Sequence, residues 1–531
     1  MHIEAVLVFV LAAVTVVVVV RWLAERTGLP AAALLPMIGI IYAYLPGPNL
    51  ELDPHLILTF ILPPLLYSAA LDSSLLAIRR NLRTVVSLSV VLVLLTALLV
   101  GVGFALFVTG ATMAVGVALG AAVAPPDPVA ALAVGHKAGL PPRLLTLIQG
   151  EGLLNDATAL TLLSVAAAAV TKGNFSFPYA AFRFVLVAAG GVVVGVVVAY
   201  LVRLLRPLGK DPLIANAISL ATPFVAYLAA EQAHVSGVLA VVVAGLIIGH
   251  YAPGTSSGAS RLQTSAVWRL VDFLLEGFVF LLIGQQLKPV VRGLKQYEIG
   301  TILAAVGITL GVVLLLRPLW LLLTQSLPRS LHTRLGNEEA GSDKLTGREV
   351  AALSWAGTRG VISLAAIFTL LPDFPLRDLL LFCTFVVVVI TLVVQGVTFA
   401  PLVRALGLRA NAADQARLRN QARSAAVQAA LDRLDDLEPD VDRHAIDTMR
   451  QTLHTRLRRY QGRLDLLEGA DSDEIPVSPQ YEAAVEVRRA AIEAQREELL
   501  RWRDAGQLPD EGLRRLEREL DHEERMLPDR R

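Results

Sequence analysis

Two residue classes are scarce in this sequence: charged residues and cysteine. Charged residues make up 18% of the 531 positions, and Cys383 is the single cysteine. One thiol can form neither a disulfide framework nor a thiolate metal site within the chain. The formal net charge is +1, and outside the C-terminal part no basic stripe is interleaved with aromatic residues. We therefore expect no nucleic-acid binding.

Hydrophobic residues are abundant instead, at 55%, and they occur in long runs. Runs of about twenty predominantly apolar residues recur from Ile3 to Leu406, each long enough to cross a hydrocarbon layer of ~30 Å as a helix. The first run lacks a basic leading region and a small-residue cleavage site, so we interpret it as a retained helix. The chain is predicted to be an all-α integral membrane protein in a lipid bilayer.

The apolar runs predict about thirteen membrane spans. These begin near Ile3, Ala31, His55, Thr84, Met113, Leu144, Tyr179, Pro212, Val235, Ala266, Ile299, Glu349 and Leu376. Lys and Arg gather on alternate loops, for example at Arg79, Arg80 and Arg83, which the positive-inside rule places in the cytoplasm. The run Lys288 to Lys295 lies on an opposite loop and argues against this orientation. We expect a multi-pass plasma-membrane protein with its N-terminus outside and its C-terminus in the cytoplasm.

The composition changes after Arg409. Residues 410–531 are rich in Arg, Glu, Asp, Ala, Gln and Leu, which favours solvated helices in a hairpin or a coiled coil. We therefore divide the chain into a transmembrane domain, 1–409, and a cytoplasmic charged helical tail, 410–531. The pattern is equally compatible with a structural tail and with a regulatory or dimerising one, and it names no partner for the tail.

The fifth apolar run is interrupted by prolines. Pro125, Pro126 and Pro128 surround Asp127, so three prolines fall within four residues. They remove backbone donors and clash with the preceding turn, so the helix has to break near the middle of the membrane. Transporters bind ions at such breaks, where protein or a hydrated cavity satisfies the freed groups. A kink or a loop at the membrane edge, with Asp127 in water, is the alternative.

Two further apolar runs carry ionisable side chains. Glu151, Asn155 and Asp156 open the sixth run, and the first two are four residues apart on one helix face. Arg359 lies between two glycines in the twelfth run, which suits a second discontinuous helix and a buried ion pair. A helix end in the cytosol and an arginine that snorkels to the surface are the alternatives.

The two interrupted runs are the fifth and the twelfth, seven spans apart. An odd offset inverts the orientation, so spans one to six and eight to thirteen are predicted to be inverted-topology repeats joined by the seventh. Two broken helices that cross at the midplane point like ends of their dipoles at each other. Asp127 and Arg359 are the charges suited to compensate these dipoles.

Five short motifs follow one another in a specific order. They are Leu62-Pro63-Pro64-Leu65-Leu66, Asp127-Pro128-Val129-Ala130, Glu151 with Asn155-Asp156, His234-Val235-Ser236-Gly237-Val238-Leu239-Ala240, and Gly357-Thr358-Arg359-Gly360. At these residues the sequence resembles the monovalent cation:proton antiporter-1 family, the bacterial NhaP-type and animal-type sodium/proton exchangers. The resemblance runs along nearly the whole membrane region.

This resemblance implies a fold and an activity. The activity is the exchange of Na⁺, or of K⁺ or Li⁺, for protons by an antiporter that is not an enzyme and holds no cofactor. The fold is NhaA-like, with two crossed discontinuous helices. In a homodimer, helices one to three and eight to ten would form the scaffold and helix seven the linker. Helices four to six and eleven to thirteen would carry the ion in an elevator-type movement.

The resemblance also implies roles for individual residues. Asp156 would bind the transported cation or the proton, with Asn155 as its orienting neighbour, and exchange would be electroneutral, one cation for one proton. The charge of Asp127 would compensate the dipoles of the half-helices, and backbone near Pro126 would help to line the ion-binding site. The resemblance further implies a structural ion pair, which consists of Glu151 and Arg359.

Three positions depart from the usual pattern of the family. Ser68 follows the Leu-Pro-Pro motif where a glutamate is common, Gly152 replaces a frequent serine, and Pro126 replaces a hydroxyl residue. The preferred cation therefore does not follow from the resemblance. Ser68 and Thr358 are predicted accessory residues.

A single carboxylate can couple the two movements, because it holds either a proton or a cation. Partial desolvation would raise the affinity of Asp156 for a proton. The alternative functions are a K⁺/H⁺ antiporter, a cation channel, and a membrane sensor that signals through the tail.

Two acidic residues, Asp272 and Glu276, lie four residues apart in the tenth span. They are interpreted as structural or vestibule residues, with a second ion site as the alternative.

Overall fold

A computed structural model describes residues 3–45, 56–172, 177–205, 211–255, 257–326, 345–409, 412–436, 443–468, 479–505, 507–525 and 527. All regular elements in these residues are helical, which confirms the predicted all-α class. The chain divides into two compact units, Met1–Arg409 and Ala410–Arg531.

The first half of the membrane unit follows the predicted spans closely. Its helices are α1 (Ile3–Thr27), α2 (Ala31–Ala43), a π-helical turn (Ile57–Ile61) that continues into α4 (Leu62–Leu71), α5 (Leu75–Arg80), α6 (Leu82–Val86), a second π-helical turn (Ser87–Val91) that continues into α7 (Leu92–Phe107), α8 (Met113–Val123), α9 (Pro128–Ala138), α10 (Pro142–Lys172) and α11 (Phe177–Leu205).

The second half contains a matching interruption. Its elements are α12 (Pro212–Gln232), α13 (Gly237–Thr255), α14 (Gly258–Gln285), α15 (Leu287–Gly293), a 3₁₀ turn (Leu294–Gln296), α16 (Ile299–Ser326), α18 (Gly347–Trp355), α19 (Val361–Phe368), α20 (Arg377–Ile390), a third π-helical turn (Thr391–Gln395) and α21 (Gly396–Ala405).

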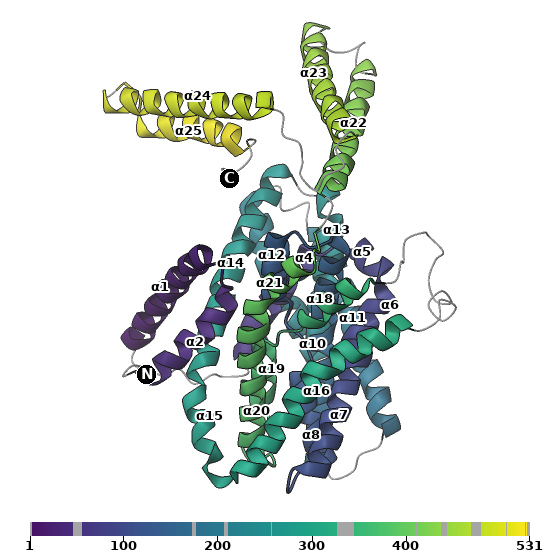
Figure 1. Cartoon of the computed structure of the whole chain (residues 1–531). Coiled ribbons are helices and arrows are strands. Elements are labelled where there is room, and N and C mark those ends of the chain that lie inside the picture. The colour runs from purple at the N-terminus through teal and green to yellow at the C-terminus, as the bar shows by residue number, and fades with distance from the viewer. Residues whose placement is uncertain are drawn as a thin grey trace. The chain divides into compact units, whose positions relative to one another are not determined.

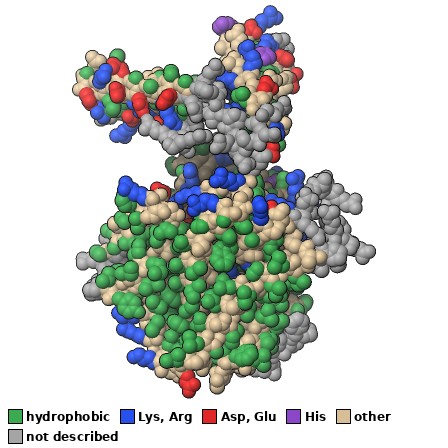
Figure 2. All heavy atoms as spheres, in the orientation of Figure 1, with side chains coloured by type: hydrophobic (Ala, Val, Ile, Leu, Met, Phe, Trp, Pro, Cys, Tyr) green, Lys and Arg blue, Asp and Glu red, His purple; other side chains and the backbone are tan. Residues whose placement is uncertain are grey.

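The surface of the membrane unit fits a lipid environment. Figure 2 shows a broad belt of hydrophobic side chains bordered by Lys and Arg. Within the described residues, eight helical segments are long and apolar enough to cross a membrane. Helices also occupy the other predicted positions, α1, α2, α4, α14 and α18–α19. The multi-pass membrane class is confirmed, whereas the number of thirteen spans stays a prediction.

Close helix packing encloses the interrupted helices. Gly101 on α7 faces Gly116 on α8, and a Cβ added at Gly116 would lie 2.8 Å from the Gly101 Cα, so only glycine permits this approach. α16 packs against both α7 and α20 (Figure 1). One hydrophobic cluster joins α7, α8, α16, α19 and α20, and it includes Val123, the last residue of α8 before the first break.

The second unit consists of paired helices. α22 (Ala412–Asp435) packs against α23 (Arg443–Glu468), and α24 (Pro479–Asp504) packs against α25 (Asp510–Arg525). Arg496 on α24 forms ion pairs with Asp521 at 2.5 Å and with Glu524 at 2.6 Å on α25. The described parts of this unit are helical, and the assignment of residues 410–531 as a cytoplasmic tail stays a prediction.

Candidate ion-binding site

The two interrupted helices meet at their breaks. The amide of Asp127, which separates α8 from α9, donates to the carbonyl of Thr358 at 2.6 Å. The Thr358 hydroxyl donates to the carbonyl of Asp127 at 2.9 Å. Each break therefore satisfies backbone groups of the other, which is the condition under which non-helical backbone is tolerated at membrane depth.

Arg359 lies at the C-terminal ends of two half-helices. Its Nε donates to the Val123 carbonyl at 2.9 Å, and Nη2 donates to the Ala124 carbonyl at 3.3 Å. Nη1 donates to the Gly357 carbonyl, just past α18. Free carbonyls at a helix C-terminus carry partial negative charge. The guanidinium of Arg359 thus compensates the ends of α8 and α18 together.

Asp127 lies at the opposite, N-terminal ends. Its Oδ1 accepts a hydrogen bond from the Val129 amide at 3.0 Å and so caps α9. Gly360 is the N-cap residue that precedes α19, and a Cβ added there would overlap the Asp127 carboxylate. The carboxylate therefore faces the positive ends of α9 and α19. At the crossing, the negative charge of Asp127 therefore lies at N-terminal helix ends and the positive charge of Arg359 lies at C-terminal helix ends.

Asn155 and Asp156 bring unpaired oxygen atoms to this crossing. They are 0% and 4% exposed on α10. The Asn155 amide nitrogen donates to the Pro126 carbonyl at 2.8 Å, while its Oδ1 is buried without a hydrogen-bond partner. Among the described residues, no hydrogen bond reaches the Asp156 carboxylate. Oxygen atoms of this kind are the ligands that hard cations prefer.

Gly152 permits the close approach of α10 to the first break. A Cβ at Gly152 would overlap the ring of Pro128. A serine at position 152 would therefore collide with the Pro128 ring as the two helices are packed here. Asn155 lies almost one turn further along α10, where it reaches Pro126.

The structural ion pair differs from the expectation. Glu151 pairs with Arg317 of α16, with Nη2 at 2.8 Å from Oε2 and a second contact between Nη1 and Oε1. This corrects the expected pairing of Glu151 with Arg359. The Arg359 guanidinium is occupied by main-chain carbonyls at the helix ends, whereas Arg317 reaches the Glu151 carboxylate.

Arg317 was missing from the predicted site. It is 3% exposed in the second half of α16, and its Nε also donates to the Leu353 carbonyl of α18 at 2.9 Å. A charged residue inside an apolar run indicates a buried partner. This signal was present at Arg317 as well as at Arg359, and it could have identified Arg317. The sequence carried no signal that would assign the two arginines to their partners.

The predicted accessory residues occupy different places. Thr358 lies within the second break. Ser68 on α4 donates a hydrogen bond to Oδ2 of Asp272 on α14, whose Oδ1 is buried without a partner. Glu276, one turn further along α14, interacts electrostatically with both Asp272 and Asp127. A direct role of Ser68 or Thr358 in ion binding stays a prediction.

Comparison with known proteins identifies the family. The family model described as the transmembrane sodium/hydrogen exchanger matches residues 13–405. The chain belongs to the sodium/hydrogen exchanger family. This confirms the resemblance to the monovalent cation:proton antiporter-1 family, a family of transporters that exchange cations for protons.

Relatives of this exchanger cover most of its length. It is 32% identical over 544 residues to an uncharacterised Na⁺/H⁺ exchanger of Mycobacterium tuberculosis, covering 98% of this chain and 96% of that protein. It is 31% identical over 386 residues to a sodium, potassium, lithium and rubidium/H⁺ antiporter of Bacillus subtilis, covering 70% of this chain and 57% of that protein.

A solved structure shares the fold of the exchanger. The sodium proton antiporter MjNhaP1 of Methanocaldococcus jannaschii matches with a TM-score of 0.61 at 19% identity, covering 76% of this chain and 99% of that one. At this identity the match concerns the fold alone. It supports an NhaP-type arrangement of the membrane helices.

Proposed function

We propose that this chain exchanges Na⁺, or K⁺ or Li⁺, for protons across the plasma membrane, with Asp156 as the group that binds either ion. The observation that carries the proposal is the enclosed Asp156 carboxylate on α10, which receives no hydrogen bond from the described residues. The buried Oδ1 of its neighbour Asn155 also lacks a partner. Together they offer oxygen ligands to a dehydrated monovalent cation.

The balance of charge around the breaks supports one ion per cycle. Asp127 and Arg359 carry opposite charges at the helix ends, and Glu151 neutralises Arg317. Asp156 is left without a counter-charge among these five groups. One proton or one monovalent cation makes the set neutral, and a neutral set costs least to move through a low-dielectric region. Exchange is therefore electroneutral, one cation for one proton.

Buried polar contacts support an elevator-type movement of the predicted core. They join span five to span twelve at the breaks, and span twelve to span thirteen through the Arg359 amide and the Thr391 hydroxyl at 2.9 Å. Span six is joined to span eleven by the Glu151–Arg317 pair, and to span four by the Ser89 hydroxyl at 3.2 Å from the Glu151 carbonyl. The hydrogen bond from the Asn155 amide nitrogen to the Pro126 carbonyl joins span six to span five, so these contacts together link all six spans of the core.

The scaffold has a polar link of its own. Ser68 and Asp272 connect spans three and ten, which both belong to the predicted scaffold. Polar links within each group of helices favour a rigid-body movement of one group against the other. The scaffold would dimerise, with the N-terminus outside the cell and the C-terminus in the cytoplasm.

Reconstitution tests the activity and its charge balance together. Full-length protein in vesicles that contain a pH-sensitive dye is given external Na⁺, Li⁺ or K⁺ while the voltage is clamped. Alkalinisation of the acid-loaded lumen by at least one cation, at a rate independent of the clamped voltage, is expected. A rate that follows the voltage would contradict electroneutral exchange. The B. subtilis relative, whose name includes four cations, makes K⁺ the first alternative to Na⁺.

A further inference from the structure

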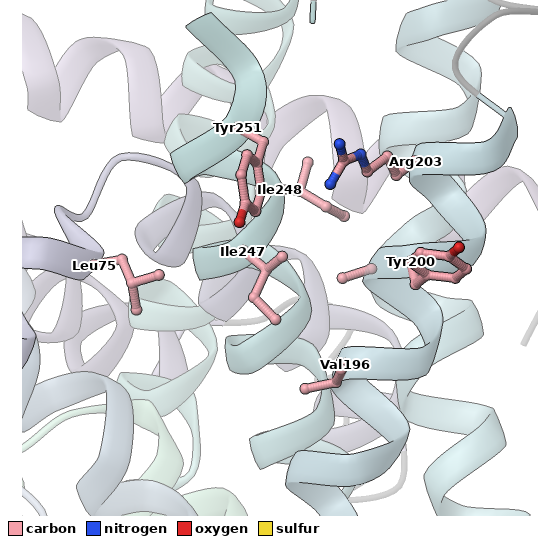
Figure 3. A pocket seen from close by; sticks show the side chains of 8 residues that line it. Leu75, Val196, Tyr200, Arg203, Ile247, Ile248 and Tyr251 are labelled. Atoms are coloured by element: carbon pink, nitrogen blue, oxygen red, sulfur yellow. The ribbon is translucent and has the colours of Figure 1, made fainter. Parts of the chain in front are cut away.

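A cavity outside the ion site lies between α5, α11 and α13 (Figure 3). Its volume is about 310 Å³, near the lower end of the ~300 to 1,000 Å³ that is usual for small-molecule sites. None of its lining residues takes part in the crossing of the broken helices. We call it the α11–α13 cavity.

The body of the α11–α13 cavity is apolar and opens to the side. Ala199 and Ile248 line it and are buried, whereas Val196 is 46% exposed and Tyr200 is 61% exposed. Along the same helix the exposed side chains include Val192, Val193, Val197, Leu201 and Leu204. The opening therefore faces the hydrophobic belt, where the surrounding molecules are lipids rather than water-soluble ligands.

One end of the α11–α13 cavity carries a positive charge. Arg203 lies in the last turn of α11, and its guanidinium carbon is 5.1 Å from the centre of the Tyr251 ring on α13. Figure 3 shows the guanidinium reaching from α11 toward that ring, with Ile247 and Val196 further down the two helices. Within the part of the chain that the structure describes, no carboxylate forms an ion pair with Arg203.

We propose that the α11–α13 cavity binds an anionic phospholipid of the surrounding membrane. The lipid phosphate would lie at Arg203, and an acyl chain would lie along Val196, Ile247 and Ile248. Basic pockets between membrane helices attract anionic headgroups, and tyrosines are typical of the boundary between headgroups and acyl chains. An apolar body with a single guanidinium at its end matches a lipid rather than a free phosphate ion.

The chain offers a matched control for the charge. Arg26, near the end of α1, has its guanidinium carbon 4.2 Å from the centre of the Trp22 ring, but it does not line the α11–α13 cavity. Arg26→Gln and Arg203→Gln therefore each remove an exposed arginine stacked on an aromatic ring. Val196→Trp gives a third variant, which fills the cavity and keeps its charge.

The test is a lipid titration of the purified full-length protein in detergent. Binding is followed by native mass spectrometry and by the shift of the melting temperature. The probes are phosphatidylglycerol, phosphatidylcholine with the same acyl chains, and inorganic phosphate. The wild type should prefer phosphatidylglycerol, and Arg203→Gln should weaken its binding about fivefold, the ratio equivalent to ~1 kcal/mol for one basic side chain.

Val196→Trp should weaken binding of phosphatidylglycerol although Arg203 is retained, and Arg26→Gln should leave it unchanged. If Arg203→Gln does not fold, the comparison of lipid binding by Val196→Trp and by Arg26→Gln still tests the proposal. Equal binding of the two lipids, or equal losses in the Arg203 and Arg26 variants, would overturn the proposal. Stabilisation by inorganic phosphate equal to that by phosphatidylglycerol would also overturn it, since the site would then be a free-anion site.

Discussion

Glu151 and Arg317 are both almost completely enclosed, at 1% and 3% exposure. Removing one partner leaves an unpaired charge away from water, which costs about 3 to 5 kcal/mol. Glu151→Gln and Arg317→Met should therefore each lower the melting temperature of the purified protein strongly. The double variant should be less destabilised than the sum of the two single variants. Additive losses would show that the two side chains do not act as a pair.

Thr391 holds the second break through a single hydroxyl. Its Oγ1 accepts a hydrogen bond from the Arg359 amide at 2.9 Å, and the residue is fully buried. Thr391→Val keeps the shape but leaves the amide without an acceptor, a cost of about 1 to 3 kcal/mol. We expect slower exchange and lower thermal stability for Thr391→Val, with both largely retained in Thr391→Ser. Equal behaviour of the two variants would contradict this role of the hydroxyl.

At the scale of elements, the crossing of the broken helices depends on the absence of a side chain at Gly360. A Cβ there would overlap the Asp127 carboxylate and push it away from the start of α19. Gly360→Ala should slow exchange about tenfold or more, because misplacing a functional group by ~1 Å can cost about 100-fold in an enzyme. Gly307→Ala on α16 is the control, since a Cβ there meets nothing within 4 Å. Unimpaired transport by Gly360→Ala would contradict the geometry of the crossing.

Local sequence signals predicted the interrupted elements but not their contacts. Pro125, Pro126 and Pro128 dictate a break, and α8 indeed ends at Val123 while α9 begins at Pro128. Whether a helix continues or breaks depends on residues close in the sequence, so the sequence alone is enough to predict this break. The partner of Glu151 lies 166 residues further along the chain. No local pattern encodes such a pairing, because it depends on how α10, α16 and α18 pack.

At the scale of the whole molecule, the residues of the ion site all belong to the unit Met1–Arg409. The second unit contributes none of the contacts described at the two breaks. A chain that ends at Arg409 should therefore still exchange cations for protons in reconstituted vesicles. A sensor that signals through the tail would lose its output in this truncated form. Complete loss of exchange in a truncated protein with a wild-type melting temperature would contradict the assignment of function to the first unit.

The central claim is that cation and proton compete for the Asp156 carboxylate. Asp156→Asn keeps the size of the side chain and removes the charge that both ions need. Glu25→Gln, at an exposed carboxylate paired with Arg21, is the matched control. In acid-loaded vesicles, the control should show cation-dependent pH recovery with Na⁺, Li⁺ or K⁺, and Asp156→Asn should show none. Normal recovery by Asp156→Asn would remove this carboxylate from the transport reaction and contradict the account.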